Sequence, residues 1–251
     1  MKSVHFLLQG KGGVGKSFIA SMLAQYLRDR LGKEKVACYD TDPVNQTFSR
    51  YGALKTETIN ILDGNDGINS RIFDSMIEKI IASKKDAAVI DNGAATFVPL
   101  LRYMNENKIA ELLKEMGIEV YFHVVITGGQ ALEDTMVGLS TVLEKLNGLV
   151  QVWSNEFFGD VSYQGKQIEQ FQVINDNQDK IIGIIRVENR TKDTFGKDIE
   201  LMVKSNLTFD EVKSSPLFTL MPVQRLLSVQ RDLYTQLDQQ TFSGNVLPLK
   251  E

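Results

Sequence analysis

The residue types and spacing near the start of the chain suit the binding of a polyphosphate. They fit the pattern G-x-x-x-x-G-K-[ST], in a segment that reads Gly10-Lys11-Gly12-Gly13-Val14-Gly15-Lys16-Ser17. Glycines allow backbone N–H groups to curl around phosphates without clashes from Cβ atoms. Lys16 can reach the β- and γ-phosphates, and the Ser17 hydroxyl is placed to bind Mg²⁺. We therefore expect an ATP site; the alternative is a glycine-rich turn with a solvated lysine.

The surroundings of this loop strengthen the same prediction. The loop follows an expected strand over Val4–Gln9 and opens an expected helix over Ser17–Leu31. Because the N-terminus of a helix carries a partial positive charge, the phosphates would lie where an anion is stabilised.

Acidic residues follow two later strands of the expected sheet. Asp40 and Asp42 lie in the segment 38–43, Cys-Tyr-Asp-Thr-Asp-Pro, and Asp91 closes the apolar run Ala87–Asp91. With a phosphate loop upstream, an apolar strand that ends in an acid is a Walker B pattern, and we assign Asp91 to Mg²⁺ through water. Phosphoryl transfer needs mostly positioning and charge stabilisation, so one carboxylate beside an in-line water suffices. Capping of the next helix is the alternative role for Asp40 and Asp42.

A second lysine opens the loop and gives the sequence Lys-Gly-Gly-Val-Gly-Lys-Ser over residues 11–17. This motif resembles that of the deviant Walker A ATPases, a family that includes the ParA and MinD proteins. The resemblance implies that Lys11 crosses a dimer interface and contacts the phosphates of the partner subunit. It also implies that Asp40 helps to hold the hydration shell of Mg²⁺ and that Asp42 orients the attacking water. A solvent-exposed lysine in a flexible loop is the alternative for Lys11.

The likeness continues at other positions, with departures. Asn155 follows an expected strand where the family places an adenine-recognising asparagine, and its amide can both donate and accept; a strand-end turn is the alternative. Phe18 stands where many relatives have Thr or Ser for the α-phosphate, Gln46 replaces a usual Asn, and Gly93 lies where Pro is more frequent. The residues expected to bind the nucleotide are Gly12, Gly13, Val14, Gly15, Lys16, Ser17, Phe18 and Asn155.

Absent features separate this chain from some branches of the family. The nitrogenase iron-protein and tail-anchor-targeting branches use cysteine pairs, whereas this chain has only Cys38. The MinD branch ends in a basic amphipathic membrane helix, whereas the tail Thr241–Glu251 contains Gly244 and Pro248, so we expect no membrane helix. Phe18 and the segment 218–222, Phe-Thr-Leu-Met-Pro, are similar to the plasmid-borne branch, which includes the TraL conjugal-transfer and StbB plasmid-stability proteins.

Composition places the chain among ordinary globular proteins and limits its partners. Its 251 residues suffice for one large domain, expected over 1–251, and 43% are hydrophobic. Lys and Arg number 28 against 32 Asp and Glu, a net charge of −4, which argues against a protein that mainly coats nucleic acid. The single cysteine and the lack of a signal-peptide pattern favour the cytoplasm.

Short apolar runs alternate with helix-period segments along the whole chain, which predicts an α/β fold. We expect a doubly wound, mostly parallel sheet of seven or eight strands with helices on both faces. The remaining expected strands are Lys35–Asp40, Ile59–Leu62, Ala87–Asp91, Val120–Thr127, Leu149–Ser154 and Ile181–Val187, and the remaining helices are Arg71–Ser83, Asn107–Met116, Ala131–Leu146 and Pro222–Gln239. The residues 156–179 are polar and predict a surface excursion.

Several polar or aromatic residues have simpler explanations than catalysis. His5 and His123 lie in expected strands among bulky apolar neighbours and should be packed. The pair Phe157-Phe158 favours a local core plug over a partner-binding tip. A solvated face is the simpler role for the best candidate basic patch, which consists of Arg186, Arg190, Lys192 and Lys197.

Together these features predict a slow Mg²⁺-ATP hydrolase that switches by ATP-dependent homodimerisation, with catalytic Lys11, Lys16 and Asp42. By resemblance, it would serve plasmid partition or conjugative DNA transfer through a plasmid-encoded partner that stimulates it, with at most weak nonspecific DNA binding. Two alternatives stay open. One is a metabolic ATP-dependent kinase or ligase resembling dethiobiotin synthetase, and the other is a nucleotide-binding module without hydrolysis.

Overall fold

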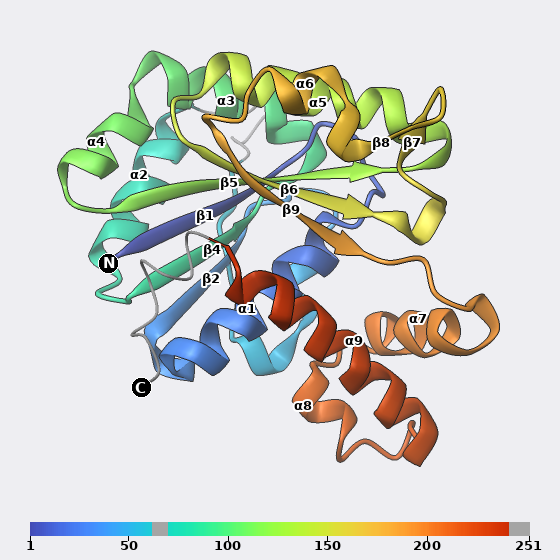
Figure 1. Cartoon of the computed structure of the whole chain (residues 1–251). Helices are drawn as coiled ribbons and strands as arrows, with labels where there is room; N and C mark the ends of the chain where they lie inside the picture. Colours follow the sequence, from blue (N-terminus) through green and yellow to red (C-terminus); the bar gives the residue numbers. More distant parts are fainter. Residues whose placement is uncertain (62–69, 241–251) are drawn as a thin grey trace.

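The computed structural model describes residues 1–61 and 70–240, and within them the chain builds one seven-stranded sheet between two layers of helices (Figure 1). The strand order is β3-β2-β4-β1-β5-β6-β9, and every strand pair in this sheet is parallel. The strands are β1 (Ser3–Leu8), β2 (Val36–Asp40), β3 (Glu57–Thr58), β4 (Ala87–Asp91), β5 (Glu119–Thr127), β6 (Leu149–Asn155) and β9 (Ile181–Val187). The expected doubly wound α/β fold is confirmed.

The helices divide between the two faces of the sheet (Figure 1). One layer contains α1 (Lys16–Leu31), α7 (Lys197–Lys204), α8 (Phe209–Val212) and α9 (Leu220–Asp238). The other contains α2 (Ser70–Ala82), α3 (Phe97–Glu106), α4 (Ile109–Glu115), α5 (Leu132–Lys145) and α6 (Gln172–Asn175). A parallel sheet covered in this way needs apolar side chains on both faces.

The first strand shows how the sequence meets that requirement. All six residues of β1 are buried. Since successive side chains of a strand point to opposite faces, Leu7 packs in the α1 layer while Phe6 and Leu8 pack in the other. The strand is therefore fixed from both sides, and the loop that follows it starts from a rigid support.

One local prediction was wrong, and one helix was missed. The strand expected at Ile59–Leu62 lies earlier, at Glu57–Thr58, where it pairs with Tyr39 and Asp40; Leu62 lies outside the described residues. Helix α3 was not predicted at all. It contains Pro99 in its first turn, a position that tolerates proline because the N–H there has no partner within the helix.

The polar region 156–179 is more than a surface excursion. It contains a short antiparallel hairpin, β7 (Ser162–Tyr163) and β8 (Lys166–Gln167). Four of its apolar side chains are buried in the core above the sheet: Val161, Ile168, Phe171 and Ile174. Isolated apolar residues among Gln and Asn gave no periodic pattern, although each fills a position in the core.

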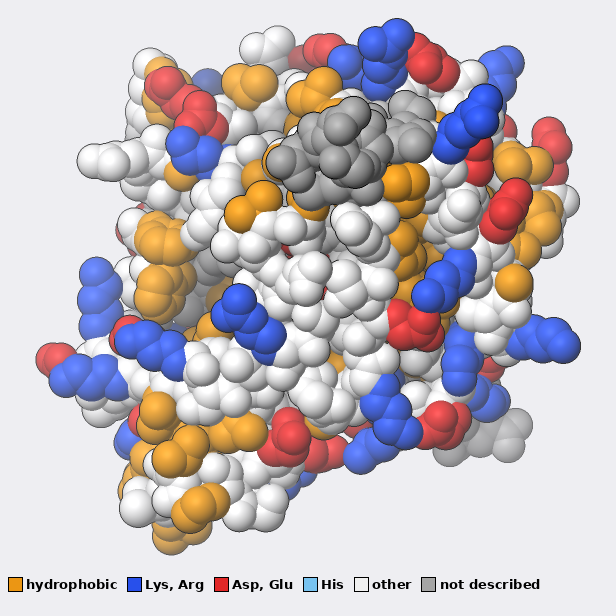
Figure 2. Space-filling model, turned by 180° about the vertical axis from the view of Figure 1, so that it is seen from behind, with side chains coloured by type: hydrophobic (Ala, Val, Ile, Leu, Met, Phe, Trp, Pro, Cys, Tyr) orange, Lys and Arg blue, Asp and Glu red, His pale blue; other side chains and the backbone are white. Residues whose placement is uncertain are grey.

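The end of the connection between α8 and α9 and the first turn of α9 carry exposed apolar side chains. Leu217, Leu220 and Met221 are 55%, 80% and 59% exposed. Apolar side chains gather at this projecting end of the molecule, at the lower left of Figure 2. No helix in the described part of the chain combines the length and apolar character needed to cross a membrane, and the tail 241–251 lies outside that part.

Candidate functional site

The glycine-rich loop connects β1 to α1 in a shape that few other residues could adopt. Gly13 and Gly15 have φ values of +75° and +95°, in the left-handed region. A Cβ atom at Gly15 would also lie 2.7 Å from Nδ2 of Asn155. Helix α1 then begins at Lys16 without a side-chain cap and without an acidic residue in its first turn. The N–H groups at this helix end are therefore available to an anion.

The side chain of Lys16 folds back onto the loop that precedes it. Its side chain is buried, and its Nζ donates a hydrogen bond to the Lys11 carbonyl at 3.1 Å. Burial lowers the pKa of Lys16, while the negative charges of Asp91 and Asp42 raise it. The ammonium group thus lies between the loop backbone and two carboxylates, where a phosphate would add to the charges that favour its protonated form.

Asp91 has a carboxylate oxygen that the described residues leave without a partner. The side chain is buried, and nothing in the described chain donates to its Oδ1. Burial raises the pKa of Asp91 to about 7, and a hydrogen bond from Ser17 opposes this shift. A buried acid beside a hydroxyl, with one oxygen unsatisfied, fits the ligand set that Mg²⁺ and its water shell require.

The two acids at the end of β2 and just after it, Asp40 and Asp42, accept hydrogen bonds from the backbone of the loop that follows the strand. Asp40 is paired in register with Asp91 on β4, and its carboxylate accepts hydrogen bonds from the N–H groups of Asp42 at 3.0 Å and Ser49 at 2.9 Å. Oδ1 of Asp42 accepts from the N–H groups of Val44 and Asn45, each at 2.9 Å. Asp42 therefore caps a turn of its own loop, whereas the helix that follows begins at Phe48 without a side-chain cap, so the helix-capping role weighed as the alternative is not seen for Asp42.

The loops after β2 and β4 touch at Gly93. A Cβ atom at this position would lie 2.8 Å from Cγ of Asp42. A side chain at this position would force one of the two loops to shift, which accounts for the glycine. Asp40, Asp42 and Asp91 converge at this edge of the sheet, as expected for residues at the carboxyl ends of neighbouring parallel strands.

Lys11 points away from its own loop and onto helix α5. Its Nζ lies 2.7 Å from Oδ2 of Asp134, and the two side chains are 45% and 57% exposed. Gln9 supports the same contact: its Oε1 accepts from the Lys11 N–H at 3.4 Å, and its Nε2 donates to the carbonyls of Val125 at 2.8 Å and Thr135 at 3.0 Å. Sequence reasoning missed Gln9 and Asp134. A glutamine that ends an apolar strand directly before a phosphate loop was the available signal for Gln9.

Asn155 anchors the loop from the end of β6. The residue is 3% exposed; its Nδ2 donates to the Val14 carbonyl at 3.0 Å, and its Oδ1 accepts from the Phe157 N–H at 3.3 Å. The amide therefore holds the phosphate loop and the start of the next segment together. One amide hydrogen and one oxygen lone pair are left for a ligand.

A cavity of about 370 Å³ opens beside the loop. Phe18 and Asn155 line it together with apolar residues of α7, and so do Phe157 and Phe158. These two phenylalanines are 47% and 51% exposed, so the predicted core plug was wrong: they form a wall of the cavity. The cavity is apolar, concave and adjacent to a phosphate loop, which suits an aromatic base.

The candidate basic patch is largely neutralised by carboxylates. Arg186 pairs with Glu156 at 2.8 Å and also with Glu169. Arg190 pairs with Asp232, and Lys197 lies 3.4 Å from Asp193. The cations thus form an ion-paired surface, in agreement with the solvated face weighed in the sequence.

A model of the CobQ/CobB/MinD/ParA nucleotide binding domain matches residues 6–226. The chain belongs to this family. Two proteins of Escherichia coli, each called Protein TraL, are 44% identical over 240 residues and 42% identical over 241 residues, in each case over 95% of this chain and 98% of the relative. The predicted resemblance to the ParA/MinD ATPases and to the branch containing TraL is confirmed.

Solved structures of the family share the fold at low sequence identity. The MinC:MinD cell division complex of Aquifex aeolicus contains a chain with a TM-score of 0.55 and 16% identity, covering 99% of both chains. A putative plasmid partition protein of Borrelia burgdorferi bound to AMPPNP has a TM-score of 0.50 and 14% identity, covering 94% of this chain and 100% of that one. The chain thus shares its overall fold with these structures.

Proposed function

We propose that this protein is a Mg²⁺-dependent ATPase that works as a dimerisation switch. One observation carries the proposal: an uncapped helix N-terminus, a buried lysine and a buried acid with an unpartnered oxygen converge on one glycine-rich loop. These groups are complementary to a triphosphate and its cation. The match to a nucleotide-binding family over residues 6–226 supports the same reading.

The nucleotide would be held at both ends. The N–H groups of Gly12–Ser17 and the Lys16 ammonium would bind the phosphates, and the Ser17 hydroxyl would complete the site with Asp40 and Asp91 around Mg²⁺. When bound, the cation neutralises charge that develops on the phosphates. The base would enter the cavity beside Phe18, where Asn155 keeps one donor and one acceptor free for the purine edge.

Hydrolysis would need one carboxylate beside the attacking water, and Asp42 is the candidate. The water oxygen attacks the γ-phosphorus, the bond to the bridging oxygen of ADP breaks, and Asp42 orients the water by accepting its hydrogen bond. In the described loop Asp42 uses Oδ1 for the turn, which leaves Oδ2 for that contact. Lys16 stabilises the charge on the leaving oxygen.

The switch would lie in Lys11. Its side chain is half-exposed and pairs with Asp134 on the outside of the loop. An exposed ion pair of this kind contributes about 0–1 kcal/mol, so it can be exchanged for a stronger contact with the phosphates of a second subunit. Dimerisation would then report the γ-phosphate, and hydrolysis would release the subunits.

The biological setting of this proposal is plasmid partition or conjugative DNA transfer in the cytoplasm, through a plasmid-encoded partner protein that stimulates a slow ATPase. The two TraL relatives and the fold shared with a plasmid partition protein support it. Weak nonspecific DNA binding stays a prediction, and it requires that retention on DNA fall steeply as salt rises.

The test is to size the protein in solution with ATP, with ADP and without nucleotide, for the wild type and Lys11→Ala. We expect a dimer only with ATP and Mg²⁺, and a monomer in all conditions for Lys11→Ala. Monomeric ATP turnover that is unaffected by Lys11→Ala would favour the metabolic enzyme instead. Phosphate release at the wild-type rate by Asp42→Ala would refute the role of Asp42, and no release by the wild type would leave a binding module.

A further inference from the structure

The sheet has an unpaired stretch of edge along β2. Strand β3 pairs only with Tyr39 and Asp40. The C=O of Lys35 accepts from Asp86 at 2.8 Å on the β4 side, whereas the C=O of Asp40 accepts from Ile59 at 2.9 Å on the other side. Because backbone groups alternate along a strand, the N–H and C=O of Val36 and the N–H of Cys38 point away from β4. No strand of the described chain lies opposite them.

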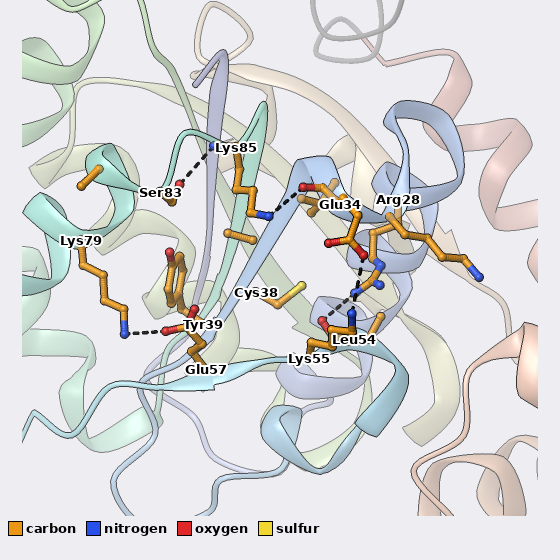
Figure 3. Close-up of a pocket in the computed structure, with 14 residues that line it drawn as sticks. Arg28, Glu34, Cys38, Tyr39, Leu54, Lys55, Glu57, Lys79, Ser83 and Lys85 are labelled. Atoms are coloured by element: carbon orange, nitrogen blue, oxygen red, sulfur yellow. Dashed lines mark hydrogen bonds and ion pairs between the residues drawn. The ribbon is translucent and has the colours of Figure 1, made fainter.

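A hollow of about 450 Å³ lies along this edge (Figure 3). Its walls come from both helical layers, so the strand edge forms the floor between them. Basic side chains stand on each wall: Lys79 and Lys85 on the side of α2, and Arg28 and Lys55 on the side of α1. Lys33 also lines the hollow, where it pairs with Asp210 at 3.6 Å. A strand added at the edge would therefore meet ammonium or guanidinium groups above and below the sheet.

The positive charge of the hollow is only partly neutralised. Two glutamates line it: Glu57 pairs with Lys79 at 2.6 Å, and Glu34 pairs with Lys55 at 3.6 Å. Lys85 donates to the Glu34 carbonyl at 2.8 Å, and Arg28 to the Leu54 carbonyl at 2.6 Å. Within residues 1–61 and 70–240, neither of these two cations has a carboxylate in an ion pair. The hollow is thus positive on a protein whose net charge is −4.

We propose that this edge binds an acidic, extended segment of a partner protein, which adds as a strand beside Val36–Cys38. An added strand would bond to the open backbone groups, which is how extended peptides dock on sheet edges. Successive side chains of the added strand point to opposite faces, so neighbouring acidic residues would reach Lys85 on one wall and Lys55 on the other.

The lysines around the hollow favour an acidic partner strand over a second copy of this chain. Lysines along a sheet edge repel the same edge of a second copy, since like charges would be brought together. The same lysines attract a strand that carries carboxylates. The proposal concerns a surface away from the phosphate loop and does not depend on nucleotide binding.

The test uses a fluorescein-labelled peptide of eight residues that alternates Glu with Val, titrated with the full-length protein and followed by anisotropy. We expect saturable binding. Lys85→Glu should weaken it about tenfold, because the reversal replaces an attraction by a repulsion at short range. The matched control is Lys145→Glu, an equal charge change at an exposed position on α5, which should leave the affinity within about twofold.

Hydrogen exchange on the wild-type protein provides a readout without any substitution. The amides of Val36 and Cys38 should exchange faster than those of Ala37 and Tyr39, which face β4, and saturating peptide should slow them roughly tenfold. The proposal is overturned by any of three results: no binding, in which case the lysines only protect the edge; equal binding by Lys85→Glu; or equal binding of a peptide with N-methylated backbone, which cannot pair with a strand.

Discussion

Two clusters of buried polar groups lie on the same sheet, and they differ in how completely their hydrogen bonds are made. One is a chain across β1, β5 and β6 in which Trp153 donates to His123 at 3.0 Å, His123 contacts His5 at 2.9 Å, and His5 contacts Ser3 at 3.0 Å. The other surrounds Asp91, whose Oδ1 has no partner in the described chain. Satisfied polar groups fix a core, whereas an unsatisfied one indicates a ligand.

The hydrogen bonds of the first cluster also determine which ring nitrogen of each histidine carries the proton. The indole of Trp153 can only donate, so Nδ1 of His123 accepts and the proton of His123 lies on Nε2. That proton is donated to Nδ1 of His5, whose own Nε2–H then donates to Ser3. Burial lowers the pKa of His5 to about 3 and that of His123 well below its usual value, so both rings stay neutral. The expectation that both histidines are packed is confirmed.

The largest effect should come from the unsatisfied cluster. Replacing Lys16 by Ala removes the buried ammonium beside Asp91, so we expect no stabilisation by Mg²⁺-ATP. In the wild type, ATP at 100 times its Kd should add about 2.7 kcal/mol and raise the Tm by about 5–10 °C in thermal unfolding. Lys197→Ala, on the ion-paired surface, is the control and should keep the shift. An unchanged Tm shift in Lys16→Ala would show that the glycine-rich loop does not bind ATP.

The satisfied cluster should respond in the opposite way. His123→Phe removes the acceptor of the Trp153 indole and the donor to Nδ1 of His5, so we expect a loss of about 2–4 kcal/mol in the free energy of unfolding. ATP affinity should be unchanged at a temperature where the variant is folded. Denaturant titration and nucleotide binding measured on the same preparation separate the two effects. Weakened ATP binding with normal stability would contradict the division between the clusters.

The Asp91→Asn variant tests the comparison through the pH dependence of folding stability. The folded-state pKa of Asp91 is raised to about 7 from 3.8, so ionisation of this group opposes folding, and its contribution to stability falls as pH rises from about 4 to 7. The Asn variant lacks this group, so without nucleotide it should gain about 1–3 kcal/mol relative to the wild type by pH 8. It should also lose the Mg²⁺ dependence of ATP binding. Thermal unfolding at pH 4 and pH 8 measures the difference, and an equal Tm offset at both values would contradict it.

The smallest effect should come from the exposed pair on the loop. Asp134→Asn removes the partner of Lys11 without touching the buried groups, so stability should change by less than about 1 kcal/mol. Because Lys11 is then free to reach a second subunit, the ATP-dependent dimer should form at about two- to fivefold lower protein concentration. Sedimentation across a concentration series measures this, with Glu133→Gln as the neighbouring control. A weaker dimer would mean that Asp134 itself contributes to the interface.

The sequence predicted the strands of the central sheet well because strands covered on both faces are unbroken apolar runs, as at Ala87–Asp91. It also assigned both Asp40 and Asp91 to Mg²⁺, and the structure pairs them because the ends of neighbouring parallel strands share one edge. Helix α3 was not predicted because Pro99 lies in its first turn, and a proline within a segment usually indicates that a helix does not continue there. The contact between Lys11 and Asp134 escaped because no local pattern links residues that are brought together only by the fold.

The close approach of Gly93 to Asp42 has a consequence for motion. Since even one added carbon there would collide with Asp42, the turn that follows β4 lies close against the turn that follows β2 and has little space to move toward it. A displacement that starts at either turn is therefore transmitted to the other by direct contact. Any signal from a bound γ-phosphate would thus reach the two segments together, as one step rather than two.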